Sequence, residues 1–422
     1  MEKNFISKEI YNDTEAATEA KRCLFCYDAE CIKGCPTSIN IPFFINQISN
    51  NDILGSAKTI LSSNILGYSC SKVCPVEVLC VKKCILQNNP IKIHKLQEYA
   101  VLNALKKKNF SFFLNYNFKK RNKKIAIIGS GPSSISAAAM LSFSGFTVDI
   151  YEKENYVGGL NSLGIIPSKL NYNESMFEIN SLFNFNPNIN IYYNCNKNKN
   201  FNYENVNKKY DEIILCIGLG EDKNFKINNK DIRFSNIIGA IELIKKIKLN
   251  LLDINTFKYF KNIHVLGGGN SAIDVAILLK TISNSDVSIF YRKNKQKMPA
   301  YESEILKAYS HSINIFYEQE PKEIFSLNNQ TFITYKNDFG KEKTLEFDFL
   351  VYSFGQNREN LNILNSFSNI NLNSFSLIDV DENYKTGNSK IWASGDCVNG
   401  GKDVVSCVEI SKHIVLKILE NN

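Results

Sequence analysis

The feature that most constrains the fold is a pattern that occurs twice: a buried strand, a glycine turn, a helix and a second strand. It runs through residues 124–153, "KIAIIGSGPSSISAAAMLSFSGFTVDIYEK", and again through 261–293, "KNIHVLGGGNSAIDVAILLKTISNSDVSIFYRK". A G-x-G-x-x-[G/A] turn between strand and helix is typical of dinucleotide-binding units with a parallel sheet. A chain of 422 residues is also too long for one ordinary core. The sequence therefore predicts several domains, two of them nucleotide-binding α/β units.

The first glycine turn has the residues of an FAD site. Gly129 allows the tight turn, Gly131 lets the backbone approach a pyrophosphate, and the small Ser134 lets the helix pack on the strand. Glu152 ends the second strand, where a carboxylate can accept hydrogen bonds from ribose hydroxyls. A second glycine turn, "YVGG", then ends at Gly159 and is of the kind found in FAD-binding reductases.

A distant segment complements this turn. "IWASGDCVNGGKDVV", residues 391–405, resembles the second FAD fingerprint of glutathione-reductase-like flavoproteins, in which an Asp such as Asp396 binds the ribityl chain. The alternative for Asp396 is an ordinary turn residue. Because strand, turn, helix, strand and acid all occur in order, we expect FAD to bind here.

The second glycine turn differs at the end of its second strand. Gly267, Gly269 and Ala272 repeat the turn, but Arg292 and Lys293 stand where the first unit has an acid. A guanidinium and an ammonium suit a 2′-phosphate, which favours NADPH over NADH. The alternative is a solvated basic pair at a strand end. A nicotinamide site beside FAD implies hydride transfer between the cofactors, so we assign no catalytic acid or base.

Eight of the twelve cysteines lie in two short runs, "CLFCYDAECIKGCP" (23–36) and "CSKVCPVEVLCVKKC" (70–84). The first run, C-x2-C-x4-C-x3-C-P, ends in the Cys-Pro of ferredoxin-type runs, whose fourth cysteine ligates a second cluster in two-cluster ferredoxins. Four-thiolate zinc sites are the alternative. Zinc has no redox chemistry, whereas iron–sulfur clusters would let a two-electron flavin pass on its electrons one at a time. We therefore favour iron–sulfur clusters.

Composition excludes other classes. The N-terminus lacks the apolar stretch of a signal peptide, and no run of eighteen apolar residues predicts a transmembrane helix, so we expect a cytoplasmic protein without a membrane partner. The net charge of +8 comes from scattered lysines rather than a basic run, which argues against nucleic acid.

Taken together, these motifs resemble dihydropyrimidine dehydrogenases, in particular their N-terminal electron-transfer portion and the separate small subunit of the bacterial NAD(P)-dependent enzyme. The resemblance covers essentially the whole chain: the cysteine runs, "NILGYSCSKVCP", "IKIHKLQEYA", both glycine turns and "ASGD". It implies two [4Fe-4S] clusters. The first would be held by Cys23, Cys26, Cys31 and Cys84, and the second by Cys35, Cys74, Cys80 and the side-chain oxygen of Gln97. Cys70 would fall at a position that is not a ligand.

The resemblance implies an electron-input subunit. It would oxidise NAD(P)H, reduce FAD by hydride transfer, and pass single electrons over both clusters to an FMN-containing partner subunit that reduces uracil or thymine. The small subunit of glutamate synthase and the flavoprotein of ferredoxin–NADP oxidoreductases share this architecture and remain alternatives; Gln97 and "LGYSC" favour the pyrimidine enzyme. From another class, a zinc-containing nucleotide-binding scaffold remains open.

The expected fold is a multidomain α and α/β protein. An α-helical, ferredoxin-like iron–sulfur domain (1–115) precedes two Rossmann-like domains of glutathione-reductase type. The NAD(P)H-binding domain (221–349) is inserted into the FAD-binding domain (116–220 and 350–422). Residues 109–124 are predicted to be a linker, and the Asn-rich residues 184–210 to be peripheral strand and loop.

Overall fold

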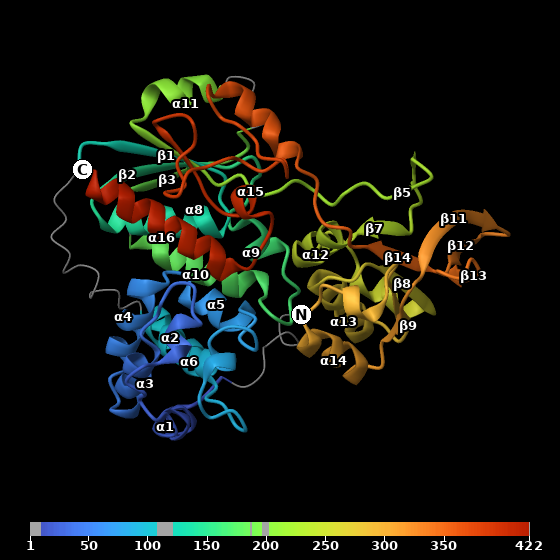
Figure 1. The fold of residues 1–422 in the computed structure, drawn as a ribbon, viewed down its shortest axis with the longest axis horizontal. Helices are drawn as coiled ribbons and strands as arrows, with labels where there is room; N and C mark the ends of the chain where they lie inside the picture. The colour runs from blue at the N-terminus through green and yellow to red at the C-terminus, as the bar shows by residue number, and fades with distance from the viewer. Residues whose placement is uncertain (1–9, 108–120, 186–187, 196–201, 422) are drawn as a thin grey trace. The chain divides into compact units, whose positions relative to one another are not determined.

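The computed structural model describes residues 10–107, 121–185, 188–195 and 202–421 (Figure 1). The chain forms two compact units. Unit 1 combines Met1–Ser162, Lys169–Leu219 and Arg358–Asn422, and unit 2 combines Leu163–Ser168 and Gly220–Asn357. The larger part of unit 2 thus interrupts unit 1 in the sequence. The predicted three-domain division stays a prediction, and both its boundary at residue 115 and most of the predicted linker lie outside the described residues.

The cysteine-rich part of unit 1 is helical. Asn12 caps its first helix because its side chain accepts the N–H of Glu15, whose carboxylate accepts the N–H of Asn12, both at 2.9 Å. The elements are α1 (Asp13–Lys21), α2 (Glu30–Lys33), α3 (Ile41–Ser49), α4 (Ile53–Ser63), α5 (Gly67–Val73), η1 (Val81–Lys83) and α6 (Ile93–Lys106). The predicted α-helical character of this part is confirmed for the described residues.

The nucleotide-binding part of unit 1 is a parallel sheet in the order β15-β4-β1-β2-β3. Its strands are β1 (Lys124–Ile128), β2 (Thr147–Tyr151), β3 (Ile189–Tyr192), β4 (Glu212–Leu215) and β15 (Ile391–Ala393). Helices α8 (Pro132–Phe143) and α16 (Val404–Glu420) pack together against this sheet (Figure 1). Because all five strands are parallel, the residues that follow β1, β2 and β15 meet at one edge.

Shorter elements complete unit 1: α9 (Gly159–Leu163), α10 (Tyr172–Asn184), α11 (Tyr203–Lys209), η4 (Glu359–Ser366) and α15 (Asp396–Asn399). The predicted peripheral strand in the Asn-rich segment is confirmed as β3, but α11 was not predicted. Residues 186–187 and 196–201 of that segment lie outside the described residues.

Unit 2 contains a second parallel sheet, in the order β10-β9-β8-β14-β7, and a three-stranded antiparallel sheet. The parallel strands are β7 (Ile237–Gly239), β8 (Asn262–Leu266), β9 (Asp286–Phe290), β10 (Asn314–Phe316) and β14 (Phe349–Tyr352). The antiparallel strands are β11 (Glu320–Leu327), β12 (Gln330–Lys336) and β13 (Glu342–Phe347), and β5 (Lys226–Ile227) pairs with β6 (Lys230–Asp231). The helices are α12 (Ala240–Lys248), η2 (Ile254–Tyr259), α13 (Asn270–Ile282), η3 (Lys295–Lys297) and α14 (Glu302–Ser310). Both predicted strand–turn–helix–strand units are confirmed.

One apolar core joins the cysteine-rich helices to the nucleotide-binding part of unit 1. Ile60 and Leu96 belong to the same buried cluster as Ile135 of α8 and Val408 of α16. Burying this shared surface ties the two parts together through the hydrophobic effect. The positions of the predicted cluster ligands and of the first glycine turn are therefore fixed within one unit.

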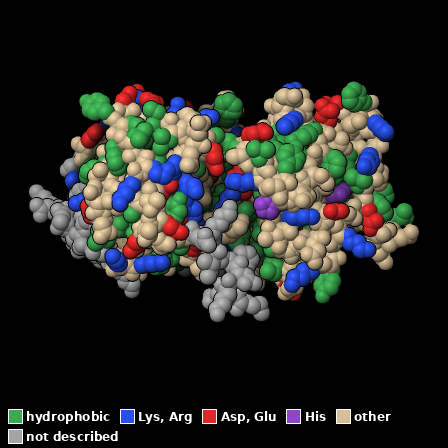
Figure 2. All heavy atoms as spheres, turned by 90° about the horizontal axis from the view of Figure 1, so that it is seen from below, with side chains coloured by type: hydrophobic (Ala, Val, Ile, Leu, Met, Phe, Trp, Pro, Cys, Tyr) green, Lys and Arg blue, Asp and Glu red, His purple; other side chains and the backbone are tan. Residues whose placement is uncertain are grey.

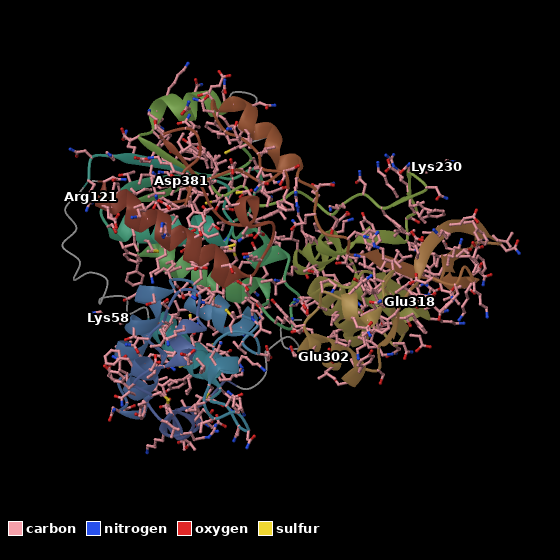
Figure 3. All side chains as sticks on the ribbon, viewed as in Figure 1. Lys58, Arg121, Lys230, Glu302, Glu318 and Asp381 are labelled. Atoms are coloured by element: carbon pink, nitrogen blue, oxygen red, sulfur yellow. The ribbon has the colours of Figure 1, made fainter. Side chains whose placement is uncertain are left out.

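Charged side chains are dispersed over the surface. On the face in Figure 2, Lys and Arg side chains are spread among acidic and hydrophobic ones. Charged residues such as Lys58, Lys230 and Glu302 point outward from the fold (Figure 3). Among the described helices, none combines the length and the hydropathy needed to cross a membrane.

Candidate cofactor sites

The first glycine turn is built by close backbone contacts. Gly129 has φ +94°, and a Cβ there would lie 2.3 Å from the carbonyl oxygen of Cys216, so only glycine fits. A Cβ at Gly159 would lie 2.9 Å from the Cα of Gly131, so the turn of "YVGG" packs directly on the first turn. By contrast, a Cβ at Gly131 would meet no described atom within 4 Å. The backbone at Gly131 is thus open to a ligand such as a pyrophosphate.

The predicted acid lies at the edge of the sheet beside this turn. Glu152 directly follows β2 and is buried. Its carboxylate accepts the hydroxyl of Ser130, within the turn, at 2.5 Å and the N–H of Glu154 at 2.9 Å. Ser134 is fully buried in α8, as its packing role requires. The fold therefore brings Gly129, Gly131, Ser134, Glu152 and Gly159 into one cradle that fits a dinucleotide.

Asp396 reaches the same cradle from the far end of the chain. It begins α15, directly after Gly395, whose φ is +82° and whose added Cβ would lie 2.4 Å from the hydroxyl of Ser133 in α8. Burial raises the pKa of Asp396, against hydrogen bonds from the Lys402 N–H and the Cys407 thiol. The structure thus places Asp396 beside the N-terminus of α8. Gly395 was not singled out in the sequence, although its place in "SGD" is the signal for it.

The second glycine turn lies in unit 2 and repeats the construction. Gly267 has φ +149°, and a Cβ there would lie 2.6 Å from the carbonyl oxygen of Ser353. A Cβ at Gly269 would meet no described atom within 4 Å, and Ala272 is fully buried in α13. Arg292 and Lys293 follow β9 and are exposed. The turn therefore fits a second dinucleotide, and its two cations are accessible.

The two cysteine runs, which are separated in sequence, pack on each other. A Cβ at Gly34, in the first run, would lie 3.1 Å from the carbonyl oxygen of Leu79 and 3.3 Å from the Cα of Cys80, in the second run. Within the described residues, no three His, Cys, Asp or Glu side chains are close enough to share a single metal ion. Ligands of a four-iron cluster each bind a different iron, so their sulfurs are necessarily farther apart than ligands of one ion.

One cavity collects the residues that the resemblance assigns to the second cluster. Cys35, Cys74, Cys80 and Gln97 all line it, together with Cys70, His94 and Val405. The Gln97 amide nitrogen donates to the carbonyl oxygen of Gly67 at 2.7 Å, which leaves its oxygen as the acceptor end. Burial, followed by the charge of Cys35, raises the pKa of Cys80 to about 12, so a cationic centre is needed to hold that sulfur as a thiolate. This donor set fits an iron–sulfur cluster.

The other four cysteines also lie near one another. Burial, followed by the charges of the neighbouring sulfurs of Cys23, Cys84 and Cys26, raises the pKa of Cys31 to about 11. Cys26 and Cys84 likewise raise the pKa of Cys23, after burial. Mutual repulsion of this kind between thiolates is relieved when they share a cationic metal centre. The set assigned to the first cluster therefore also fits such a group.

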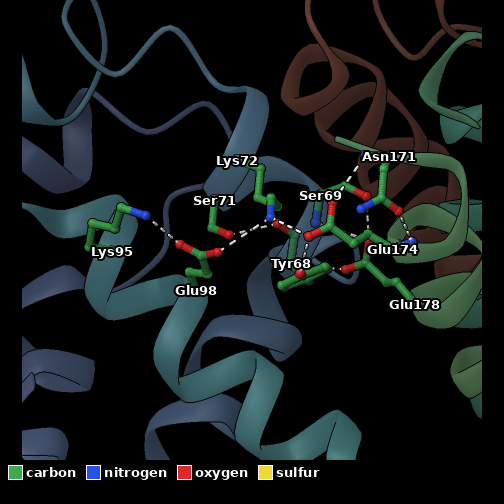
Figure 4. A network of polar contacts seen from close by, with 9 residues as sticks. All are labelled: Tyr68, Ser69, Ser71, Lys72, Lys95, Glu98, Asn171, Glu174 and Glu178. Carbon is green, nitrogen blue, oxygen red and sulfur yellow. Dashed lines mark hydrogen bonds and ion pairs between the residues drawn. The ribbon is translucent and has the colours of Figure 1, made fainter. Parts of the chain in front are cut away.

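A polar network that sequence reasoning missed joins the cysteine-rich part to α10 (Figure 4). Glu178 is fully buried and accepts the N–H of Tyr68 at 2.8 Å, the N–H of Ser69 at 3.0 Å and the Ser69 hydroxyl at 2.5 Å. Lys72 bridges Glu174 at 2.6 Å and Glu98 at 3.5 Å. Helix α5, whose C-cap residue is Cys74, is thereby held on α10. Nothing in the sequence marks a mid-helix acid as such a contact.

Comparison with protein families matches two models. Residues 123–410 match the pyridine nucleotide-disulphide oxidoreductase model, and residues 2–109 match the model described as dihydropyrimidine dehydrogenase domain II, 4Fe-4S cluster. The first match covers more than half of the chain.

Curated relatives match almost end to end. The NAD-dependent dihydropyrimidine dehydrogenase subunit PreT homolog of Salmonella typhi is 29% identical over 94% of this chain and 92% of its own. The PreT subunit of Escherichia coli K12 is 28% identical over the same shares. The resemblance to bacterial dihydropyrimidine dehydrogenase subunits is thus confirmed.

Solved structures show the same fold. Thioredoxin reductase of T. acidophilum has a TM-score of 0.57 at 19% identity, covering 71% of this chain and 99% of its own. FprA of Mycobacterium tuberculosis in complex with NADPH has a TM-score of 0.55 at 15% identity, covering 71% and 85%. The predicted fold class, a helical iron–sulfur domain followed by glutathione-reductase-like α/β structure, is confirmed. The chain is therefore a member of the pyridine nucleotide-disulphide oxidoreductase family, an NAD(P)H-dependent flavoprotein oxidoreductase that also carries an iron–sulfur domain.

Proposed function

We propose that this protein is the electron-input subunit of a dihydropyrimidine dehydrogenase. It oxidises NAD(P)H and delivers electrons through FAD and two [4Fe-4S] clusters to an FMN-containing partner subunit, which reduces uracil or thymine to the 5,6-dihydropyrimidine. The balance is one NAD(P)H and one proton consumed for each ring double bond reduced. The observation that carries the proposal is the cavity lined by Cys35, Cys74, Cys80 and Gln97, in the same unit as the FAD cradle.

Bound FAD supplies the exchange between two-electron hydride chemistry and one-electron transfer. The protein binds and orients it: the N–H groups at the start of α8 face the pyrophosphate, Glu152 takes ribose hydroxyls, and Asp396 takes the ribityl chain. Buried Glu152 is held in place by Ser130, and Gly395 brings Asp396 to the turn.

For the nicotinamide cofactor we propose NADPH as the preferred donor. Gly267, Gly269 and Ala272 form the turn, and exposed Arg292 and Lys293 stand where a 2′-phosphate would bind. The curated relatives carry "NAD-dependent" in their names, so the choice between the two nicotinamides is an explicit outcome of the experiment below.

For the clusters we propose the two ligand sets that the resemblance implies. Cys23, Cys26, Cys31 and Cys84 hold one cluster, and Cys35, Cys74, Cys80 and Gln97 hold the other. The shared cavity and the mutual pKa effects among the sulfurs support this division.

The decisive experiment copurifies the chain with its partner under anaerobic conditions and follows NAD(P)H oxidation. Oxidation that depends on uracil or thymine supports the proposal. Oxidation that depends on glutamine and 2-oxoglutarate assigns the chain to a glutamate synthase instead. Running both assays with NADPH and with NADH settles the donor in the same preparation.

A further inference from the structure

A buried hydroxyl lies against one of the proposed cluster ligands. The Oγ1 atom of Thr37 is 3.4 Å from the sulfur of Cys35, and Thr37 is only 2% exposed. When Cys35 is a thiolate, its sulfur has no proton to give, so the hydroxyl of Thr37 is the donor. This contact comes from the residue just after the Cys-Pro pair, and nothing in the cysteine spacing indicates it.

A cation from a distant helix joins this contact. Lys412, in α16, donates its ammonium to the carbonyl oxygen of Thr37 at 3.0 Å, across 375 residues of sequence. Burial lowers the pKa of Lys412, and the charge of the Cys35 sulfur acts in the opposite direction. A hydrogen bond thus holds the Lys412 ammonium on the backbone two residues from Cys35.

The same helix is anchored at the FAD cradle. Ser411, next to Lys412, donates its hydroxyl to the carbonyl oxygen of Ser133 in α8 at 2.9 Å, and Val405 lines the cluster cavity. Because α16 packs along α8, the position of the Lys412 side chain is set by that helix packing.

The sulfurs of the other proposed ligand set differ in their hydrogen bonds. Among the described residues, no side-chain hydrogen bond reaches the sulfurs of Cys23, Cys26, Cys31 or Cys84; the contact at the Cys23 sulfur comes from the backbone of Phe25. Hydrogen bonds to sulfur and a nearby positive charge both favour the reduced form of a cluster, because it carries one more negative charge.

We propose that Thr37 and Lys412 raise the reduction potential of one cluster only. It is the cluster held by Cys35, Cys74, Cys80 and Gln97, which then accepts electrons more readily than the other cluster. This inference rests on the proposed function, since it needs both clusters. It assigns the two residues a tuning role, with no part in binding iron.

The test is an anaerobic redox titration of the full chain, followed by electron paramagnetic resonance of the cluster signals. Thr37→Val removes the hydroxyl at nearly constant volume, and Thr37→Ser is its matched control. Lys412→Met removes the charge, and Lys412→Arg keeps it. We expect each loss to lower the equilibrium constant for reducing one cluster by up to about tenfold, which is about 59 mV for a one-electron couple. The reduction potentials of the second cluster and of the flavin stay unchanged. The Thr37→Ser and Lys412→Arg variants keep most of the potential of the unaltered protein.

Iron and flavin contents equal to those of the unaltered protein establish that each variant is assembled. If Thr37→Val loses iron, Lys412→Met carries the test, because its side chain comes from α16 rather than from the cysteine run. Potentials that do not move, or that move equally for both clusters, overturn the inference while uracil-dependent turnover with the partner still upholds the proposed function. Unaltered protein that lacks iron overturns both.

Discussion

The carboxylate of Glu178, in α10, holds the first turn of α5 by accepting the backbone N–H of Ser69 at 3.0 Å. The C-cap residue of α5 is Cys74, one of the proposed ligands, so this contact links the cluster cavity to the nucleotide-binding part of unit 1. Lys72 adds the second link, through Glu174 and Glu98. The two links should respond differently to substitution, because one is a single buried carboxylate and the other is a network of ion pairs.

Burial gives Glu178 a measurable pH signature. Burial raises its pKa from 4.5 to about 7, against hydrogen bonds from Ser69 and Tyr68 that lower it. Between these two values the folded state keeps a proton that the unfolded state releases, so stability falls as the pH rises through the window, by about 3 kcal/mol in total. We expect Glu178→Gln to remove most of this fall.

The measurement is urea unfolding of both proteins at about pH 5 and about pH 7.5, followed by the emission of Trp392, the single tryptophan, in β15 of unit 1. Glu302→Gln, on the surface of α14, is the control and keeps the pH dependence. Equal pH dependence in the Glu178→Gln variant and the unaltered protein would contradict the assignment.

Removing the cation of the buried network should strongly lower the stability of the fold. The side chains of Lys72 and Glu98 are 4% and 3% exposed, so Lys72→Met leaves carboxylates in a poorly solvated site. We expect a loss of about 3–5 kcal/mol in the free energy of unfolding. Lys246→Met, which breaks the exposed pair with Glu242, should cost under about 1 kcal/mol. Both variants are measured by the same tryptophan emission. Similar losses in the free energy of unfolding would show that the buried network stabilises the fold no more than an exposed ion pair does.

Substitutions of the two glycines in the first turn should have different effects. Gly129→Ala forces a side chain to 2.3 Å from the Cys216 carbonyl oxygen at φ +94°, so we expect impaired folding. Gly131 has φ −71° and open space, so Gly131→Ala should fold normally and lose FAD. The measurements are apo-protein unfolding and FAD titration by flavin fluorescence. Normal FAD affinity in Gly131→Ala would show that the cofactor does not approach this turn.

The exposed basic pair after β9 should discriminate between nicotinamides. Charge-assisted hydrogen bonds are worth about 1.5–3 kcal/mol, so we expect Arg292→Ala to raise the KM for NADPH about tenfold or more and leave that for NADH nearly unchanged. Lys295→Ala, nearby and exposed, is the control. A ferricyanide reduction assay reads both donors without the partner. Equal changes for NADPH and NADH would remove the 2′-phosphate role from Arg292.

Local patterns were enough to predict the elements around the first glycine turn. The strand–turn–helix–strand pattern placed β1, α8 and β2. A short sequence range carries this signal because a glycine turn is local. Helix α11 was missed because it has only seven residues, one of them buried and apolar, within an Asn-rich segment.

The long-range contacts could not be predicted in the same way. Glu178, Gly395 and Lys412 act across 109, 262 and 375 residues, on Ser69, Ser133 and Thr37, and their partners depend on how helices pack. Hydrophobic periodicity predicts which face of α16 is buried, but it does not predict which side chain of the neighbouring part that face meets. The proposed ligands themselves came from cysteine spacing and resemblance, and the structure adds the cavity that gathers four of them.

The most direct measurement of the central claim is the iron, acid-labile sulfide, zinc and flavin content of anaerobically prepared protein, with electron paramagnetic resonance after reduction by NAD(P)H. Two [4Fe-4S] clusters predict about eight iron and about eight sulfide per FAD, and cluster signals that NAD(P)H generates. Stoichiometric zinc without sulfide would contradict the account, because the cysteines would then hold a structural metal that passes no electrons.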